Sequence, residues 1–320
     1  MTSSQSIEIG IVLYPGVQLA AAHGLTDLFH VADRIAGRHG EDRVRLRVSH
    51  WRQPEPGAAP VRETGLEGEP AMLLIPPSLE EPPTADLAAS FSAWLLERHR
   101  AGATLGSICA GAFLLAETGL LKGRAVTTHW NYAAAFRSRF PSALLDTDRL
   151  IIDDGDIITA GGVMAWTDLG LKLVDRFLGP TIMAETARFL VVDPPGREQG
   201  YYSAFSPILT HGDAAILKTQ HWLQASGGKD MTIAILAGKA GLEERTFLRR
   251  FRKATGHTAV DYCQRLRVAK AQEHLQFGGA PVDQIAWDVG YSDPSAFRKV
   301  FLRVTGLTPG EYRRRFSVKR

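Results

Sequence analysis

Two hydrophobic patterns divide the chain near residue 195. The first 190 residues alternate short apolar runs, such as the IEIGIVLY run at Ile7–Tyr14, with segments in which apolar residues recur at helical spacing. Strands that alternate with helices indicate βαβ units and a parallel sheet covered on both faces. After Asp193-Pro-Pro-Gly196 this alternation ends, and only helical patterns follow. The sequence therefore predicts a doubly wound α/β domain followed by an all-α domain.

The patterns also predict individual elements and domain limits. Strands are expected at Ile7–Tyr14, Val44–Trp51, Ala71–Ile75, Ala103–Ile108, Ala125–Thr128, Leu150–Ile152 and Ile157–Ala160. Helices are expected at Ala20–Ile35, Asp86–Arg100, Ala110–Thr118, Tyr132–Phe140 and Trp166–Leu178. We expect an N-terminal domain at 1–194, a linker at 195–212 and a helical domain at 213–320. The helical domain opens with a helix at Asp213–Ala225.

An internal repeat is the strongest signal in the helical part. Leu236-Ala-Gly-Lys-Ala-Gly241 matches Ile285-Ala-Trp-Asp-Val-Gly290 at an offset of 49 residues. After one extra residue in the second copy, two phenylalanines, a Thr-Gly pair and a tyrosine also match. Each copy has a short apolar helix, a glycine, a tight turn and a second, basic helix, which is the pattern of a helix-turn-helix motif. The two motifs are predicted at about 232–254 and about 281–304.

The second helix of each motif has an apolar face and a basic face. Phe247 and Phe251, and likewise Phe297 and Phe301, are four residues apart and should pack inward. Arginine can contact a guanine edge with two hydrogen bonds in the major groove, and Arg or Lys can hold phosphates. The outward positions, which are our candidate DNA contacts, are Arg245, Leu248, Arg249, Arg252, Ser295, Arg298 and Lys299.

Charge and spacing support a nucleic-acid partner for the helical part. From Lys218 onward there are 19 Lys and Arg against 9 Asp and Glu, a net charge of +10, whereas the first 217 residues carry 18 against 25, a net charge of −7. A basic segment of this kind favours a polyanion. The segment Thr258–Gln276 reads as one helix of roughly 28 Å. It could hold the two reading helices about one turn of B-DNA apart, roughly 34 Å. The alternative is an ordinary helical bundle with basic faces. Two matching helix-turn-helix motifs in one chain argue against it.

Residues 230–316 resemble the DNA-binding domain of the AraC/XylS family of bacterial regulators. The resemblance rests on Ile285-Ala-Trp-Asp-Val-Gly-Tyr-Ser-Asp-Pro-Ser-Ala-Phe297, followed by Phe301, Thr305-Gly306 and Thr308-Pro309. It implies double-stranded promoter or operator DNA as the partner, a homodimer, and RNA polymerase as a further partner. It also implies base-contacting positions at Arg245, Leu248, Arg249, Pro294, Ser295, Arg298 and Lys299. The Leu248 and Pro294 side chains cannot donate hydrogen bonds, so they contact thymine methyl groups at most.

Cys109 lies at a predicted turn of the first domain where a cysteine could act as a nucleophile. The segment Leu105-Gly-Ser-Ile-Cys-Ala-Gly-Ala-Phe113 reads as a strand, a small-residue turn and a helix. A nucleophile at such a turn should be strained and exposed, and the helix N-terminus should lower the pKa of its thiol. His129 follows another predicted strand, and a cysteine beside a histidine is the minimal pattern for nucleophilic catalysis. The alternative is a buried small residue that packs at the turn.

Residues 7–190 resemble the DJ-1/PfpI branch of the class I glutamine amidotransferase-like fold, which is flavodoxin-like. The resemblance includes Leu13-Tyr-Pro-Gly-Val-Gln-Leu19, the Cys109 turn, Thr128-His129 and Thr159-Ala-Gly-Gly162. The whole chain therefore resembles the GlxA-type subgroup of AraC regulators. In DJ-1-like relatives a carboxylate reaches the cysteine, but that position falls on Ala21 here, and the nearby His23 is not an acid.

These observations lead to two hypotheses for the first domain. The first is a sensor without catalysis, in which Cys109 and His129 are remnants and a small-molecule effector binds beside Cys109, Ala110, His129 and Trp130. The second is a cysteine-dependent hydrolase, amidase or glyoxalase-like enzyme that uses Cys109 and His129. The missing acid favours the first. The protein would then be a sequence-specific transcription regulator of metabolic genes.

Other chemistry is not indicated by the sequence. The two cysteines have no metal-ligand spacing and form no disulfide framework, and Asp153, Asp154 and Asp156 read as a solvated turn, so we expect neither a metal nor a cofactor. No apolar run approaches the roughly 20 residues that span a bilayer, and no secretory signal pattern opens the chain. We therefore expect a cytoplasmic, nucleoid-associated protein without a membrane partner.

Overall fold

The computed structural model describes residues 6–40, 44–65, 68–196, 198–199, 202, 205, 207, 209, 211–229 and 231–318. The chain divides into two compact units, Met1–Gln199 and Gly200–Arg320, which we describe separately. Within the described residues, no helix is both long enough and apolar enough to cross a membrane. Much of the predicted linker at 195–212 lies outside the described residues.

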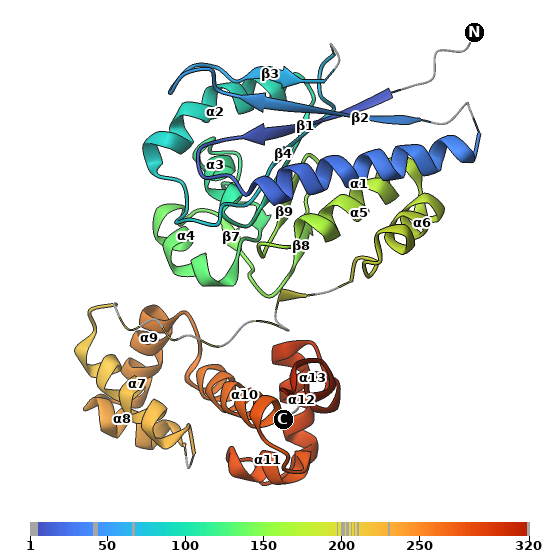
Figure 1. Cartoon of the computed structure of the whole chain (residues 1–320). Coiled ribbons are helices and arrows are strands. Elements are labelled where there is room, and N and C mark those ends of the chain that lie inside the picture. The colour runs from blue at the N-terminus through green and yellow to red at the C-terminus, as the bar shows by residue number, and fades with distance from the viewer. Residues whose placement is uncertain are drawn as a thin grey trace. The chain divides into compact units, whose positions relative to one another are not determined.

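The N-terminal unit is built on one seven-stranded sheet (Figure 1). Its strand order is β3-β2-β1-β4-β5-β9-β8, and the five inner strands run parallel while β3 and β8 pair antiparallel at the edges. This arrangement confirms the predicted doubly wound sheet. The strands are β1 Ser6–Leu13, β2 Arg45–Arg52, β3 Val61–Thr64, β4 Met72–Ile75, β5 Thr104–Ile108, β8 Ile151–Asp153 and β9 Ile157–Ala160.

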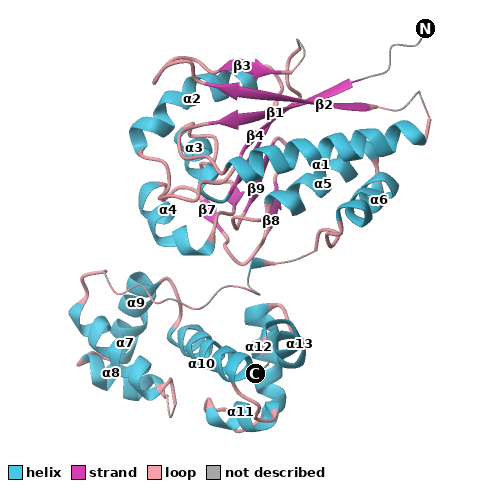
Figure 2. Cartoon of the chain, viewed as in Figure 1, coloured by secondary structure: helices cyan, strands magenta, loops and turns pink. Residues whose placement is uncertain are grey.

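Helices cover both faces of this sheet, as Figure 2 shows. Alternate residues of β1 point to opposite faces, so Ile9 and Ile11 enter one core and Val12 enters the other. The first core packs against α1 Leu19–Arg38, α5 Trp166–Leu178 and α6 Pro180–Leu190. The second packs against α2 Ala85–Arg100, α3 Ala112–Glu117 and α4 Ala133–Arg139.

Some elements of this unit differ from the prediction. A single residue separates α6 from α5, because Gly179 adopts a φ of 89° and Pro180 starts a new helix. Strand β3 is an edge strand with a single apolar residue, Val61, so it carries no alternating signal. The predicted strand at Ala125–Thr128 is only β6 Ala125–Val126, which pairs with β7 Leu144–Leu145 in a separate two-stranded sheet.

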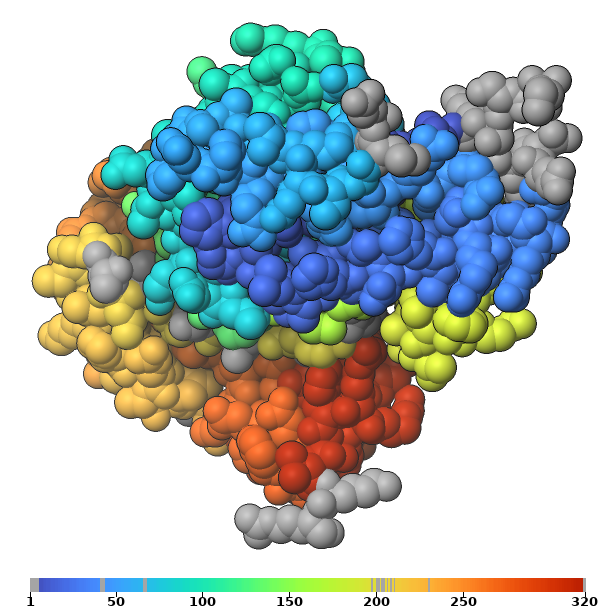
Figure 3. Space-filling view, turned by 45° about the horizontal axis from the view of Figure 1, so that its top comes forward, coloured from blue at the N-terminus to red at the C-terminus, as the bar shows by residue number. Residues whose placement is uncertain are grey.

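The C-terminal unit is helical and has two cores. The first core draws on α7, α8, α9 and the start of α10, and the second on the rest of α10 and on α11, α12 and α13; Figure 3 shows atoms of this unit in gold, orange and red. The N-terminal part of α10 packs in the first core through Tyr262, and its C-terminal part packs in the second through Val268 and Leu275. The helices are α7 Ala214–Ser226, α8 Ile233–Ala240, α9 Glu244–Thr255, α10 Ala259–Phe277, α11 Val282–Asp288, α12 Pro294–Thr305 and α13 Pro309–Phe316.

The two cores repeat the same contacts. The Thr255 hydroxyl donates to the carbonyl of Phe251 at 2.8 Å, and the Thr305 hydroxyl donates to the carbonyl of Phe301 at 2.8 Å. Each of these phenylalanines meets a tyrosine edge to face, with ring centroids 5.2 Å apart in the first core and 5.5 Å in the second. The repeat in the sequence is therefore a repeat of packing.

Candidate functional site

The second helix of each repeat, α9 and α12, presents a polar face to solvent. Phe247 and Phe251 of α9 and Phe297 and Phe301 of α12 are fully buried. The predicted outward residues are all exposed, namely Arg245, Leu248, Arg249, Arg252, Ser295, Arg298 and Lys299. Phenylalanine spacing therefore places seven side chains where a partner can reach them.

Carboxylates cap both helices at their N-termini. The Glu243 side chain accepts a hydrogen bond from the backbone N–H of Thr246 at 3.2 Å. The Asp293 carboxylate accepts from the N–H groups of Ser295 and Ala296, and Pro294 occupies the first helical position, where no N–H is needed. These caps fix where each exposed face begins.

Two arginines on these helices are held by carboxylates. Arg250 of α9 forms a bidentate pair with Asp213, the N-cap of α7, through hydrogen bonds of 2.9 and 2.6 Å. This pair lowers the pKa of the Asp213 carboxyl and ties α9 to α7. Arg298 of α12 is an ion-pair partner of Asp283 on α11. Arg250 is thus committed to packing, whereas Arg298 belongs to the exposed face.

Cys109 lies at a strained turn, but its thiol is buried. Its φ of 54° is in the left-handed region, which is unusual for a residue other than glycine and agrees with the predicted sharp turn. The side chain is fully buried, and burial raises the pKa of the Cys109 thiol to about 12. The prediction of an exposed thiol with a lowered pKa is therefore wrong. Desolvation outweighs the hydrogen bond from the N–H of Ala110 because the thiol is fully buried.

His129 and Trp130 are closer to solvent than Cys109. Both are partly exposed, their ring centroids are 5.3 Å apart, and Tyr132 lies 5.7 Å from His129. His129 Nδ1 accepts a hydrogen bond from the N–H of Asn131 at 3.1 Å, so a neutral His129 carries its proton on Nε2. Burial lowers the pKa of His129 and favours that neutral form.

Thr128 connects the histidine segment to the Cys109 turn. Its hydroxyl donates a hydrogen bond of 2.7 Å to the carbonyl of Cys109.

Ala110 is fully buried, as is Ala21 in the first turn of α1. Gln18, the N-cap of α1, is also buried, and its Oε1 atom has no hydrogen-bond partner within the described residues. The start of α1 therefore carries an amide oxygen at position 18 and a methyl group at position 21.

A cavity of about 610 Å³ opens elsewhere on the N-terminal unit. It lies at the carboxyl ends of β1 and β2 and is lined mainly by apolar groups. Its polar lining includes Gln53 and Ser90, which hydrogen-bond to each other at 3.1 Å. Neither Cys109 nor His129 lines this cavity. Ligands of doubly wound sheets bind at the carboxyl ends of strands, so it is a second candidate binding place.

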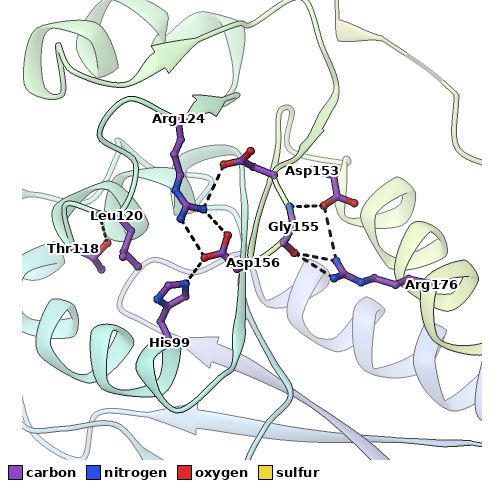
Figure 4. Close-up of polar contacts among 9 residues, drawn as sticks. His99, Thr118, Leu120, Arg124, Asp153, Gly155, Asp156 and Arg176 are labelled. Carbon is purple, nitrogen blue, oxygen red and sulfur yellow. Dashed lines mark hydrogen bonds and ion pairs between the residues drawn. The ribbon is translucent and has the colours of Figure 1, made fainter.

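The aspartates of the β8–β9 turn are engaged in ion pairs (Figure 4). Asp156 binds Arg124 at 2.5 Å and His99 at 2.7 Å, and these two partners hold the pKa of its carboxyl at about 2. Asp153 pairs with Lys172 at 3.1 Å. Within the described part of the chain, no group of His, Cys, Asp or Glu could hold a metal ion. The turn is solvated, as predicted, and its ion pairs link it to Arg124 ahead of β6, to α2 and to α5.

The sequence patterns did not single out Asp283, Gln18 or Gln199 as site residues. The repeat contains a signal for Asp283, because it aligns this acidic residue with the apolar Ala234 of the first motif. Gln199 approaches the His129 segment from a distant part of the chain, which no local pattern reveals.

Comparisons with known proteins match both units. Residues 236–315 match the helix-turn-helix domain family, and residues 67–176 match the DJ-1/PfpI family. The chain is 30% identical over 235 residues to the HTH-type transcriptional regulator GlxA of Rhizobium meliloti, covering 72% of this chain and 71% of that protein. It is 28% identical over 222 residues to the HTH-type transcriptional regulator CdhR of Pseudomonas aeruginosa, and this match covers 69% of this chain and 66% of that protein. The crystal structure of Drosophila melanogaster DJ-1beta is 17% identical, with a TM-score of 0.45, and the match covers 59% of this chain and 100% of that one.

The two family matches agree with the two units of the structure. A doubly wound sheet with a cysteine at its strained turn precedes a helical unit with a duplicated helix-turn-helix motif. The relatives are named as transcriptional regulators, and the match to GlxA covers more than two thirds of both chains. The chain belongs to the family of DNA-binding transcriptional regulators that join a DJ-1/PfpI domain to an AraC-type helix-turn-helix domain.

Proposed function

We propose that α9 and α12 read two successive major-groove faces of an operator, and that a small molecule bound by the N-terminal unit controls this reading. The proposal is carried by the exposed polar faces of two helices that repeat the same packing. Arg245, Arg249, Arg298 and Lys299 supply donors for bases and phosphates. Leu248 offers an apolar surface to a thymine methyl group.

The DNA contacts are tested with a site that the full-length protein selects from a randomised duplex pool. Arg249→Ala and Arg298→Ala should each weaken binding to that site by roughly 1–3 kcal/mol at fixed salt. Arg250→Ala is the matched control, since this arginine of the same helix is committed to Asp213. It should affect stability more than base preference. If neither Arg249→Ala nor Arg298→Ala changed specific binding, the assignment of the reading faces would fail.

The effector is proposed to bind beside Cys109, Ala110, His129 and Trp130. The strained turn and the partly exposed rings of His129 and Trp130 support a place for a polar small molecule. Control of metabolic genes by such a ligand is part of the same proposal. A thermal-shift screen of small metabolites, repeated on His129→Ala and Trp130→Ala, would test it. Gln53→Ala, in the separate cavity, is the control. If only this variant lost the ligand-induced thermal shift, the effector would bind in that cavity and not beside Cys109.

The N-terminal unit is proposed to sense without catalysing. A buried Cys109 with a raised pKa and an alanine at position 21 both disfavour a thiolate nucleophile. The competing enzyme reading has one observation in its favour, the strained φ of Cys109. Cys109→Ala in a promoter-reporter strain separates the two, since a sensor should keep its regulation. Hydrolysis of amides or consumption of glyoxals by the purified protein, lost in Cys109→Ala, would overturn the proposal.

A homodimer and a contact with RNA polymerase complete the proposal. Both come from the family resemblance and from the symmetry of many operators. Sedimentation of the full-length protein with and without its selected DNA tests the dimer. A monomer at micromolar concentration in both conditions would contradict it.

A further inference from the structure

An ion pair joins the two helices of the second motif. Arg298 Nη2 of α12 donates to Asp283 Oδ1 of α11, and each side chain is about half exposed. Asp283 lies in the first turn of α11, and Arg298 lies in the second turn of α12. The pair therefore sits on the surface that carries the candidate base contacts of this motif.

The first motif lacks both members of this pair. The repeat aligns Asp283 with Ala234, which is likewise the second residue of its helix, α8. It aligns Arg298 with Leu248, which is 41% exposed on α9. Two charges in one copy thus correspond to two apolar side chains in the other. This paired difference, within a repeat that otherwise keeps its packing, indicates that Asp283 and Arg298 form one functional unit.

The pair restricts how Arg298 can approach DNA. An arginine has five donor hydrogens in a planar fork, and Asp283 engages only Nη2, so Nε and Nη1 remain able to donate. Holding one arm of the fork reduces the side-chain freedom that would be lost on binding. The Asp283 carboxylate also repels phosphates. Both effects favour a base edge over the backbone as the partner of Arg298.

We propose that Asp283 is a positioning residue that determines specificity by aiming Arg298 at a guanine edge in the major groove. The inference rests on the proposed DNA contact of Arg298 and goes beyond it. It assigns a carboxylate of α11, outside the reading helix, to base recognition. It also assigns unequal chemistry to the two half-sites: a guanine held by a buttressed arginine in one, and an apolar contact through Leu248 in the other.

The test compares base preference rather than affinity alone. Full-length wild-type protein and Asp283→Ala are each used to select sites from a randomised duplex pool. Wild type should select a guanine at one position of the α12 half-site. Asp283→Ala should lower the preference for that guanine by about tenfold, with the slope of affinity against salt unchanged, since no phosphate contact is lost. Asp288→Ala, at the end of the same helix, removes an equal charge that faces Gln284 and should keep the preference.

The outcomes separate this inference from the proposed function. If Arg298→Ala changed neither affinity nor base preference, the reading face itself would be wrong. If Arg298→Ala abolished the guanine preference while Asp283→Ala kept it, only the role of Asp283 would fail. Equal tightening of selected and random DNA by Asp283→Ala would also overturn it, because Asp283 would then only compete with DNA.

A reciprocal variant tests the pair in the first motif, where it takes the place of the proposed apolar contact of Leu248. Ala234 is exposed, so the double change Ala234→Asp with Leu248→Arg places the pair in the first motif at solvent-facing positions. This variant should gain a guanine preference in the α9 half-site that Leu248→Arg alone acquires less strongly. Equal preference in the single and double variants would mean that the carboxylate does not aim the arginine.

Discussion

The side-chain amide of Gln199 donates a hydrogen bond of 2.9 Å to the carbonyl of Thr128. The same nitrogen also donates to the Thr127 hydroxyl at 3.0 Å, and Gln199 Oε1 accepts from the N–H of Trp130 at 3.3 Å. Gln199 is buried, and it is the last residue of the N-terminal unit. The last residue of the N-terminal unit is therefore anchored at the proposed effector site, so a ligand that moved Thr128 or Trp130 would move this anchor.

Removing the Gln199 amide should destabilise the N-terminal unit. Gln199→Ala leaves buried acceptors without a donor, which costs about 1–3 kcal/mol. Gly161→Ala should act on the same contact, because a Cβ at Gly161 would lie 1.8 Å from the Gln199 amide nitrogen. Urea unfolding of the full chain measures both changes. The double variant should lose less stability than the sum of the single losses, and strict additivity would mean that the two residues do not share one contact.

Most of the fold could be predicted from local hydrophobic patterns in the sequence. Ile9 and Ile11 alternate with Val12 along β1 as a sheet covered on both faces requires, and the phenylalanine pairs of α9 and α12 predicted which residues those helices expose. The start of α6 was missed because Gly179-Pro180 reads as the end of a helical region, although the chain only changes direction there.

The chemistry of Cys109 could not be predicted in the same way. Its sharp turn was visible in the small residues around it, but its pKa depends on how completely distant elements cover the thiol. The contacts of Gln199 join residues about 70 positions apart in the sequence, as its hydrogen bond to Thr128 shows. Local patterns carry neither quantity, because burial and long-range hydrogen bonds are fixed by tertiary packing.

The Cys109 thiol should be chemically silent near neutral pH. Burial raises its pKa to about 12, so the nucleophilic thiolate is scarce at pH 7–8, and the thiol is also shielded from reagents. Cys263 is buried with a pKa of about 12 as well. Iodoacetamide labelling followed by mass spectrometry should modify neither residue in the native protein, and both after denaturation in urea. Rapid native labelling of Cys109 with a midpoint below pH 8 would restore the reactive-nucleophile reading.

The stability of the helical unit should depend on Asp261 at low pH. His257 and Arg265 hold the pKa of this carboxyl at about 2 in the folded protein, below an ordinary unfolded value of about 3.9. A depressed folded pKa gives stability that is fully present above the unfolded pKa and is lost as the pH falls through the folded value. Asp261→Asn should therefore cost about 1–2 kcal/mol at pH 6–7, and wild type should lose this advantage between about pH 4 and pH 2.

Calorimetry of the full chain at a series of pH values checks the Asp261 prediction. Glu273→Gln serves as the control, since it removes a carboxylate from an exposed position of the same helix, α10. A gap between wild type and Asp261→Asn that stayed constant down to pH 2 would show that the effect does not come from the ionised carboxyl.

Arg267 of α10 should hold the two motifs in one geometry. Its guanidinium donates to the carbonyl of Gly228, ahead of the first motif, at 2.8 and 2.5 Å. The same group lies 5.3 Å from the ring centroid of Tyr291, in the turn of the second motif. Arg267→Ala removes both contacts, so the reading helices should become less well fixed relative to each other.

Binding to two half-sites measures this loss directly. A fixed geometry makes the second motif bind at a high effective concentration, so Arg267→Ala should weaken binding to a two-half-site duplex by about tenfold or more. Its affinity for a duplex with one half-site should change little, because no base contact is removed. Lys270→Ala, an exposed position on the same helix, controls for the lost charge. Equal weakening on both duplexes would mean that Arg267 acts through general electrostatics, and the spacing of the motifs would then be set by α10 alone.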